Sequence, residues 1–215
     1  MKIEKFPPYS LDDFIREKIT ENEIMIQGEY QTGTAVVLGR VTPHSSDVNV
    51  AACIQDDVPI LRRKGGGGAV LLFPGVLVLN CTLKKDNKAV DLMEFLEIAV
   101  AKIKDGILDY MDLPLSIRGN GDLCIGDKKI LGSSIYSTKD YITYYCTLII
   151  RGNINLISKY LLHPSKEPEY RQGRTHEDFI TSIEANGNIA DDEKLFNSII
   201  RSLGTININD LILVD

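Results

Sequence analysis

The chain has 215 residues, of which 44% are hydrophobic and 25% are charged, and this balance is typical of one ordinary globular domain. The formal net charge of −6, without any Lys/Arg-rich tail or stripe, argues against a nucleic-acid partner. No apolar run approaches the roughly 20 residues of a membrane helix, and residues 1–10 lack the apolar segment of a signal peptide. We therefore expect a cytoplasmic protein that has no membrane partner.

The hydrophobic patterns predict a helix over residues 11–19 with Ser10 as its N-cap, and further helices over 90–111, 154–162 and 191–203. The predicted strands cover residues 33–38, 58–62, 69–73, 76–83, 115–118, 123–125, 129–136, 141–151 and 206–214. Several strands follow one another directly, and no linker rich in Pro, Gly or Ser divides the chain. This order predicts one domain over 1–215 with an α+β fold, in which helices flank mixed, largely antiparallel sheets.

The four cysteines, at positions 53, 81, 124 and 146, are widely spaced, and most of them lie in apolar runs. No CxxC pair is present, so zinc ligands or the disulfides of a secreted scaffold are poor interpretations. We expect buried, reduced thiols, as is usual for a cytoplasmic protein.

A glycine-rich segment begins with Arg62, Arg63 and Lys64, continues through glycines 65–68, and leads into a predicted strand. Glycines bury no side chain and lose much conformational entropy on ordering, so a run of four needs a reason other than packing. Successive backbone N–H groups in such a loop form a concavity that binds anions, and the adjoining cations would add charge-assisted bonds. The pattern favours anion binding over a flexible hairpin, although it is not a P-loop.

The paired lysines Lys128 and Lys129 follow a predicted hairpin turn at Gly126-Asp127. Under strict alternation, Lys129, Leu131 and Ser133 share one face of the strand. One lysine would then point into a cleft, where its ammonium can stabilise a developing negative charge. The alternative, that both lysines are surface charges beside a turn, is equally consistent with the sequence.

Taken together, these segments resemble the lipoate-protein ligase A family of the biotin/lipoate ligase superfamily. Residues 62–70 match the family's RRxSGGGAV motif, with Gly65 at the serine position. Residues 39–49 are similar to its GRxQNPxxEVN segment, and 120–134 to its ND(L/I)…G(R/K)KxxG(S/N)A segment. Residues 144–148 lie where HHGTLL is usual. The resemblance extends from about residue 36 to about residue 183, with every motif in the family's order.

The resemblance implies a class II synthetase/biotin-ligase-like catalytic domain, and with it a chemistry. ATP and magnesium would activate lipoate, or octanoate, to an acyl-adenylate. The acyl group would then pass to a lysine of a lipoyl carrier domain, either in the acyltransferase subunit of a 2-oxoacid dehydrogenase or in the glycine cleavage H protein. Lys129 would be the catalytic residue, and Asp122 would be a magnesium ligand. The apolar residues Val70, Leu71 and 76–79 would line the acyl tunnel. Substrate or adenylate contacts would come from Arg62, Arg63, Gly66, Gly67, Gly68, Ala69, Asn120, Asp122, Gly132 and Ser133.

The sequence departs from the family in two places. Leu72 and Phe73 stand where the family carries His-Asp, and Val78 and Asn80 replace its following Asn and Ser. The smaller C-terminal domain of full-length ligases has little room before residue 215, so we expect a separate C-terminal ligase subunit as a further partner.

A polar loop over residues 169–179 gathers Arg171, Arg174 and His176, which would contact phosphate or the incoming carrier. The same residues also read as a helix start, with Thr175 as N-cap and Asp178 at the third position.

Two other functions stay open. An ATP-independent octanoyl or lipoyl transferase would need an activated thiolate, for which Cys146 is the first candidate. A non-catalytic protein that binds lipoyl domains would need neither thiolate nor ATP, and the missing His-Asp pair makes it credible.

Overall fold

The computed structural model describes residues 9, 24–85, 89–187, 189, 191–207 and 211. The predicted helix over 11–19, its cap Ser10 and most of the predicted strand over 206–214 lie outside these residues. In the described part of the chain, no helix is long and apolar enough to cross a membrane.

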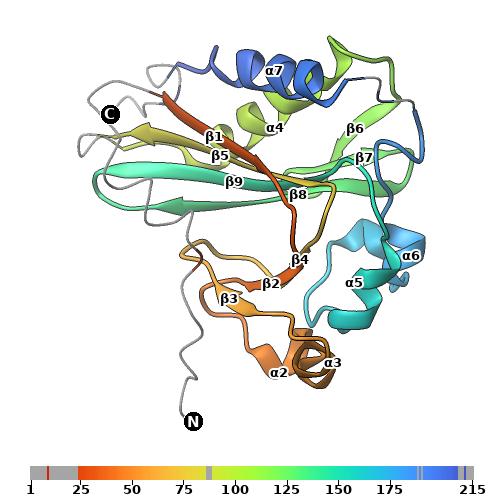
Figure 1. Cartoon of the computed structure of the whole chain (residues 1–215). Coiled ribbons are helices and arrows are strands. Elements are labelled where there is room, and N and C mark those ends of the chain that lie inside the picture. Colours follow the sequence, from red (N-terminus) through yellow and green to blue (C-terminus); the bar gives the residue numbers. More distant parts are fainter. Residues whose placement is uncertain are drawn as a thin grey trace.

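A six-stranded sheet, antiparallel at every neighbouring pair, forms the centre of the molecule (Figure 1). Its strands lie in the order β1-β5-β9-β8-β7-β6. They are β1 (Ile24–Tyr30), β5 (Val76–Lys84), β6 (Leu115–Arg118), β7 (Asp122–Ile125), β8 (Lys128–Ser137) and β9 (Tyr141–Ile149). The predicted turn at Gly126-Asp127 is confirmed, because Ile125 pairs with Lys128 and Gly126 has a φ of 60°.

A smaller sheet has the order β3-β2-β4, and it lies below the large sheet in Figure 1. Its strands are β2 (Ala35–Leu38), β3 (Ile60–Arg62) and β4 (Val70–Leu72). β2 and β4 are antiparallel, whereas β2 and β3 are parallel. Parallel neighbours need a crossover connection, and α2 (His44–Asp47) and α3 (Val50–Gln55) supply it. The α+β fold with mixed, largely antiparallel sheets is therefore confirmed.

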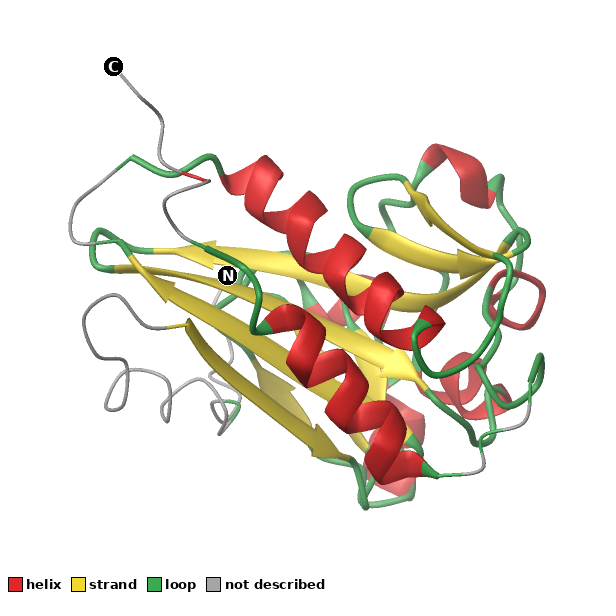
Figure 2. Ribbon diagram, turned by 90° about the horizontal axis from the view of Figure 1, so that it is seen from above, coloured by secondary structure: helices red, strands yellow, loops and turns green. Residues whose placement is uncertain are grey.

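Two helices, α4 (Leu92–Leu108) and α7 (Asp192–Leu203), lie side by side across one face of the large sheet (Figure 2). α4 begins at its N-cap Asp91, whose carboxylate accepts the N–H groups of the first turn. Gly106 lets the two helices pack closely, because a Cβ built there would stand 2.6 Å from the Cα of Ile199.

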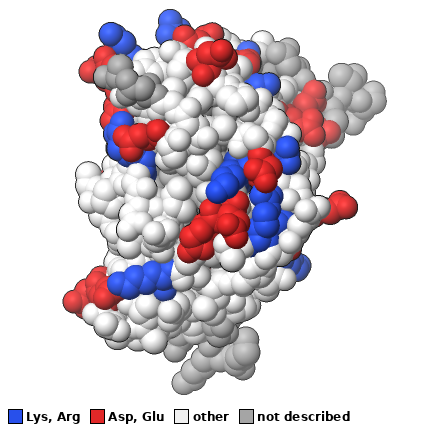
Figure 3. All heavy atoms as spheres, turned by 90° about the vertical axis from the view of Figure 1, so that its right-hand side faces the viewer, with Lys and Arg blue, Asp and Glu red and all other residues white. Residues whose placement is uncertain are grey.

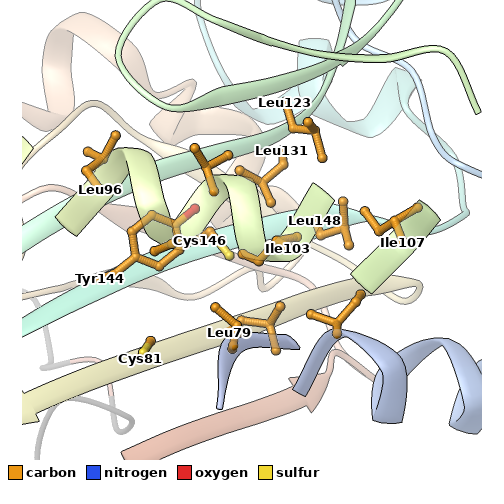
Figure 4. Packing of buried hydrophobic residues seen from close by; sticks show 14 of the residues in the cluster. Leu79, Cys81, Leu96, Ile103, Ile107, Leu123, Leu131, Tyr144, Cys146 and Leu148 are labelled. Carbon is orange, nitrogen blue, oxygen red and sulfur yellow. The ribbon is translucent and has the colours of Figure 1, made fainter. Parts of the chain in front are cut away.

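The main hydrophobic core fills the layer between these helices and the sheet. Figure 4 shows Ile103 and Ile107 of α4 in one cluster with Tyr144 and Cys146 of β9 and Leu79 of β5. All four cysteines are free and buried, as predicted, and burial raises the pKa of the Cys81 and Cys146 thiols to about 12.

The opposite face of the large sheet meets the small sheet and three short helical segments, α5 (Asn155–Tyr160), η1 (Glu169–Arg171) and α6 (His176–Phe179). A second hydrophobic cluster lies there and includes Val36 and Leu72 of the small sheet. One cluster thus covers each face of the large sheet. The predicted site residues Arg63, Gly67 and Lys129 lie on the side of the small sheet.

Strand β1 and helices α2 and α3 are absent from the sequence prediction. Gly28 and Glu29 interrupt the apolar pattern of β1, and both residues disfavour strands. Gly28 has a packing reason, since a Cβ built there would lie 2.4 Å from the ring of Phe196 in α7. Helices α2 and α3 are too short to show a helical period.

Candidate functional site

A cavity of about 260 Å³ lies between the small sheet and strands β8 and β9 of the large sheet. One part of its wall is polar and carries Gly67 and Gly68 of the glycine loop together with Lys129. The rest is apolar and includes Val70, Leu72, Val76, Val78, Ile149, Ile157, Leu161, Phe179 and Ile180. A cavity with one polar and one apolar part would suit a ligand that has a long apolar chain and an anionic end.

The glycine loop connects β3 to β4, and its four carbonyl oxygens all accept hydrogen bonds from the protein. The oxygen of Gly65 accepts from the N–H of Arg40, and that of Gly67 from the Thr42 hydroxyl. Arg63 donates to the oxygens of Gly66 and Gly68. The hydrogen-bond acceptors of the loop are thereby satisfied within the protein.

In contrast, none of the four N–H groups of glycines 65–68 donates a hydrogen bond within the described part of the chain. Gly67 adopts a φ of 86°, which favours glycine and allows successive N–H groups to converge. The loop therefore offers donors without acceptors. This arrangement is what an anion-binding loop would need, and anion binding itself stays a prediction.

The two arginines before the loop hold its backbone together. Arg63 is 8% exposed, and its Nε, Nη1 and Nη2 atoms all bond carbonyl oxygens, including that of Val37. Arg62 donates through Nη1 to the oxygens of Gly39, Arg40 and Thr42. Direct contact between either guanidinium and a ligand stays a prediction.

Lys129 is linked to two side chains near the opposite wall. Its Nζ lies 2.8 Å from Oδ1 of Asp122, and the hydroxyl of Tyr170 donates to Oδ2 of the same carboxylate at 2.7 Å. Lys129 lines the cavity. Lys128, by contrast, donates to the carbonyl of Glu177 at an exposed site, so only one lysine of the pair enters the cleft.

The expectation that Lys129, Leu131 and Ser133 share one face is wrong. A β-bulge at Ile130 shifts the register of β8 against β7, so Leu123 pairs with Leu131 but Cys124 pairs with Lys129. Leu131 consequently packs in the main core, while the Lys129 side chain turns to the other side.

Gly132 makes this turn possible. A Cβ built on Gly132 would stand 2.9 Å from both Cε and Nζ of Lys129, so the glycine leaves room for the lysine stem. Ser133 lines the cavity, and its hydroxyl donates to the carbonyl of Gly121. Ser134 faces the loop instead, with its Oγ 3.3 Å from a Cβ built on Gly65.

The polar loop over residues 169–179 is both a helix start and part of the cavity wall. The Thr175 hydroxyl accepts the N–H of Asp178, which confirms the predicted cap. Arg171 and His176 line the cavity, and burial lowers the pKa of both side chains. Arg174 points elsewhere and pairs with Asp127 in the β7–β8 turn.

Arg174 and Asp127 lie on the face that carries α6, where Figure 3 shows basic and acidic side chains next to one another.

Asp47 is a cavity residue that the sequence analysis does not single out. It is 5% exposed, and its Oδ1 has no hydrogen-bond partner. Its Oδ2 lies 3.6 Å from a Cβ built on Gly68, so the carboxylate stands beside the loop. An unpaired, buried carboxylate is costly and favours a ligand that brings donors. The only available signal is its place in the GRxQNPxxEVN-like segment.

Four of the predicted contacts, Arg62, Gly66, Asn120 and Asp122, do not line the cavity. Asn120 is exposed in the turn between β6 and β7 and does not line the cavity. Ala69 does line it. In the expected acyl tunnel, Val76 and Val78 face the cavity, but Leu77 and Leu79 belong to the main core because successive strand residues alternate.

The missing His-Asp pair is replaced by buried apolar residues. Leu72 and Phe73 are each 1% exposed and pack in the second cluster. Neither offers a polar atom of its side chain to a nucleotide.

Comparison with known proteins adds sequence evidence to this geometry. The model of the lipoyl protein ligase A/B catalytic domain matches residues 8–203. A protein named probable lipoate-protein ligase A from Mycoplasma genitalium is 27% identical over 160 residues, which are 73% of this chain and 47% of the relative. The chain thus spans about half the length of that relative.

Solved structures show the same fold. A bipartite lipoate protein ligase of Thermoplasma acidophilum, studied with its E2 lipoyl domain, has a TM-score of 0.74 and 17% identity, covering 89% of this chain and 74% of its own. A lipoate-protein ligase A bound with ATP has a TM-score of 0.72 and 16% identity, covering 89% and 76%. Because the family model covers most of the chain, this protein belongs to the lipoyl protein ligase A/B catalytic-domain family.

Proposed function

We propose that this chain uses ATP to activate lipoate, or octanoate, to an acyl-adenylate and transfers the acyl group to a lysine of a lipoyl carrier domain. The proposal rests mainly on the difference between the carbonyl and the N–H groups of the glycine loop. Its four carbonyls are bonded within the protein, while its four N–H groups have no partner among the described residues. An acyl-adenylate joins a carbonyl to a phosphate, and both are hydrogen-bond acceptors.

The proposed reaction has two steps. A carboxylate oxygen of the acid attacks the α-phosphorus of ATP, and the bond to pyrophosphate breaks. The amine of the carrier lysine then attacks the acyl carbonyl, AMP leaves with the bonding electron pair, and the amine gives up a proton. Both steps concentrate negative charge on oxygen, which the loop N–H groups and the Lys129 ammonium would stabilise. The apolar part of the cavity would hold the acyl chain.

A thiolate route has less support from the structure. The Cys146 side chain lies in the main core, and burial raises the pKa of its thiol to about 12 (Figure 4). Burial also raises the pKa of Cys124, whose thiol donates weakly to the Tyr170 hydroxyl at 3.6 Å. A transferase that forms a thioester needs a thiolate at neutral pH, and neither environment favours one.

Magnesium binding by nucleotides usually needs one or two protein carboxylates together with phosphate oxygens. Both oxygens of Asp122 are already bonded to Lys129 and Tyr170, whereas Asp47 has an oxygen without a partner. Asp47 is therefore the better fit, and Asp122 as a metal ligand stays a prediction. The ion would neutralise charge on the triphosphate.

The carrier and a second polypeptide are further parts of the proposal. We expect the carrier to be an acyltransferase subunit of a 2-oxoacid dehydrogenase or a glycine cleavage H protein. The similar Thermoplasma ligase is bipartite, and this supports a second ligase polypeptide as a partner of this chain.

The test is to incubate the protein with ATP, magnesium, lipoate and an apo lipoyl domain, with and without a C-terminal ligase polypeptide. We expect AMP, pyrophosphate and a carrier whose mass has increased by one lipoyl group. Transfer from an octanoyl carrier without ATP, abolished by Cys146→Ser, would contradict the proposal. The buried Leu72 and Phe73 make a non-catalytic binder the second candidate, and tight binding of the lipoyl domain without turnover would favour it.

A further inference from the structure

We infer that Tyr170 is a positioning residue for Lys129 and acts through the carboxylate of Asp122. The inference rests on the proposed function, in which Lys129 is the catalytic ammonium. Tyr170 does not line the cavity, so its effect on a ligand would be indirect.

The three side chains form a chain of short contacts. The Tyr170 hydroxyl donates to Oδ2 of Asp122 at 2.7 Å, and Oδ1 of Asp122 accepts from Nζ of Lys129 at 2.8 Å. With one carboxylate oxygen fixed by the tyrosine, the other oxygen is directed at the lysine. An ammonium has three donors, so the Asp122 bond leaves two of them for a ligand.

Lys129 needs such support because its stem is flexible. A lysine side chain has four rotatable bonds and loses considerable rotamer entropy when it is held in one place. The β-bulge and Gly132 give the stem space, but they do not hold its end. The contact with Asp122 is the ion pair that fixes the position of Nζ among the described residues.

Tyr170 is itself held from several sides. Its ring packs against Phe179 at 5.2 Å between centroids, and the guanidinium of Arg118 lies 5.9 Å from its centroid. Arg174 donates to its carbonyl oxygen at 2.9 Å and also pairs with Asp127, which ties the segment to the β7–β8 turn. These contacts hold both the ring and the backbone of Tyr170.

The surroundings of the Tyr170 hydroxyl also favour its protonated form. Burial, together with the Asp122 charge, raises the pKa of Tyr170 well above its usual value. The raised pKa favours the protonated phenol, which is the form that donates to Asp122.

The molecule contains a matched control for this arrangement. In a second cluster, the Tyr160 hydroxyl donates to Oδ2 of Asp56 at 2.8 Å, and Nζ of Lys159 lies 2.6 Å from the same oxygen. None of these three residues lines the cavity. Tyr160→Phe thus removes the same kind of bond without touching the site.

The first experiment compares Tyr170→Phe with Tyr160→Phe in the complete acyl-transfer assay. For Tyr170→Phe we expect kcat to fall about tenfold, because the lost hydrogen bond to a charged group leaves Lys129 less well placed, with little change in KM for lipoate. Tyr160→Phe should keep the wild-type kcat. In an Asp122→Asn background, Tyr170→Phe should lower kcat no further, since the tyrosine acts only through that carboxylate. A rise in KM with unchanged kcat would overturn the inference.

The second experiment needs no turnover. Limiting acetic anhydride is added to each folded protein, and the acetylation of Lys129 is measured by mass spectrometry relative to all other lysines. In Tyr170→Phe we expect Lys129 to react several times faster, because its ion pair is loosened. Equal reactivity of Lys129 in the two variants would contradict the inference. If the wild type shows no acyl transfer, the proposed function fails while the labelling still decides the role of Tyr170.

Discussion

The two polar walls of the cavity are built in different ways. The glycine loop offers backbone N–H groups, and Arg63 holds its shape by binding carbonyl oxygens behind it. The opposite wall relies on one side chain, Lys129, whose position depends on Asp122 and Tyr170. A backbone site tolerates changes in side chains as long as the loop keeps its conformation, whereas a side-chain site depends on each member of its network.

The largest loss of activity is expected at the side-chain wall. Lys129→Ala removes the cation that would stabilise the charged transition state, and we expect kcat to fall about a thousandfold. The free energy of unfolding should fall modestly, because Asp122 loses its ion pair but keeps the hydrogen bond from Tyr170. Lys128→Ala is the control, because Lys128 contacts the carbonyl of Glu177 outside the site. Steady-state kinetics and urea unfolding of both variants check this. A similar loss of activity in both would remove the distinction between the two lysines.

The next largest effect should be at the backbone wall. Arg63 uses three different nitrogens to hold carbonyls, and a lysine cannot reproduce that fork. We expect Arg63→Lys to lose about 2 kcal/mol or more of unfolding free energy, together with most adenylate binding. Arg62 donates to the carbonyls of Gly39, Arg40 and Thr42, which lie outside the glycine run, so Arg62→Lys should disturb the loop less. Equal stability losses in the two variants, measured by urea unfolding, would contradict this account of the loop.

Gly132→Ala tests how strongly activity depends on the position of the Lys129 ammonium. The new Cβ would stand 2.9 Å from the end of the lysine side chain and displace it. We expect kcat to fall about tenfold, as small misplacements of a catalytic group commonly cause. Gly33→Ala is the control, because a Cβ built at Gly33 meets nothing within 4 Å. Unchanged kcat in Gly132→Ala would show that the position of Lys129 is less critical than proposed.

The smallest effect concerns pH. Burial lowers the pKa of His176 below its ordinary value of 6.5, so the folded protein keeps this imidazole neutral where the unfolded chain is protonated. The stability that results is present above about pH 6.5 and is lost as the pH falls through the lower pKa of the folded state. His176→Gln should flatten the decline of unfolding free energy between pH 7 and pH 5. An unchanged slope in thermal or urea unfolding would contradict the burial of a neutral His176.

The sequence predicts one wall of this cavity better than the other. The arginines and glycines of the loop are neighbours in the sequence, so an anion-binding role can be predicted from their composition and order. The orientation of Lys129 is not local, because it depends on a bulge at Ile130 that strict alternation cannot reveal. The pairing of Tyr170 with Asp122 joins residues 48 positions apart, and only the fold brings them together.

A similar contrast holds for the fold. The long helix α4 and the central strand β5 are predictable, because their apolar patterns are long and continuous. Strand β1 is not, since Gly28 serves a contact with α7 that the local sequence does not show. Asp47 is missed for the same reason: only the packed structure shows that its carboxylate is buried and unpaired beside Gly68.

The central claim is that the glycine loop and Lys129 together bind an acyl-adenylate. Calorimetric titration with a non-hydrolysable lipoyl-adenylate analogue, in which a sulfamate replaces the phosphate, tests it most directly. We predict that the analogue binds at least about a hundredfold more tightly than lipoate alone, and that Lys129→Ala and Arg63→Lys each remove most of this advantage. Equal affinity of the wild-type protein for the analogue and for lipoate would contradict the claim.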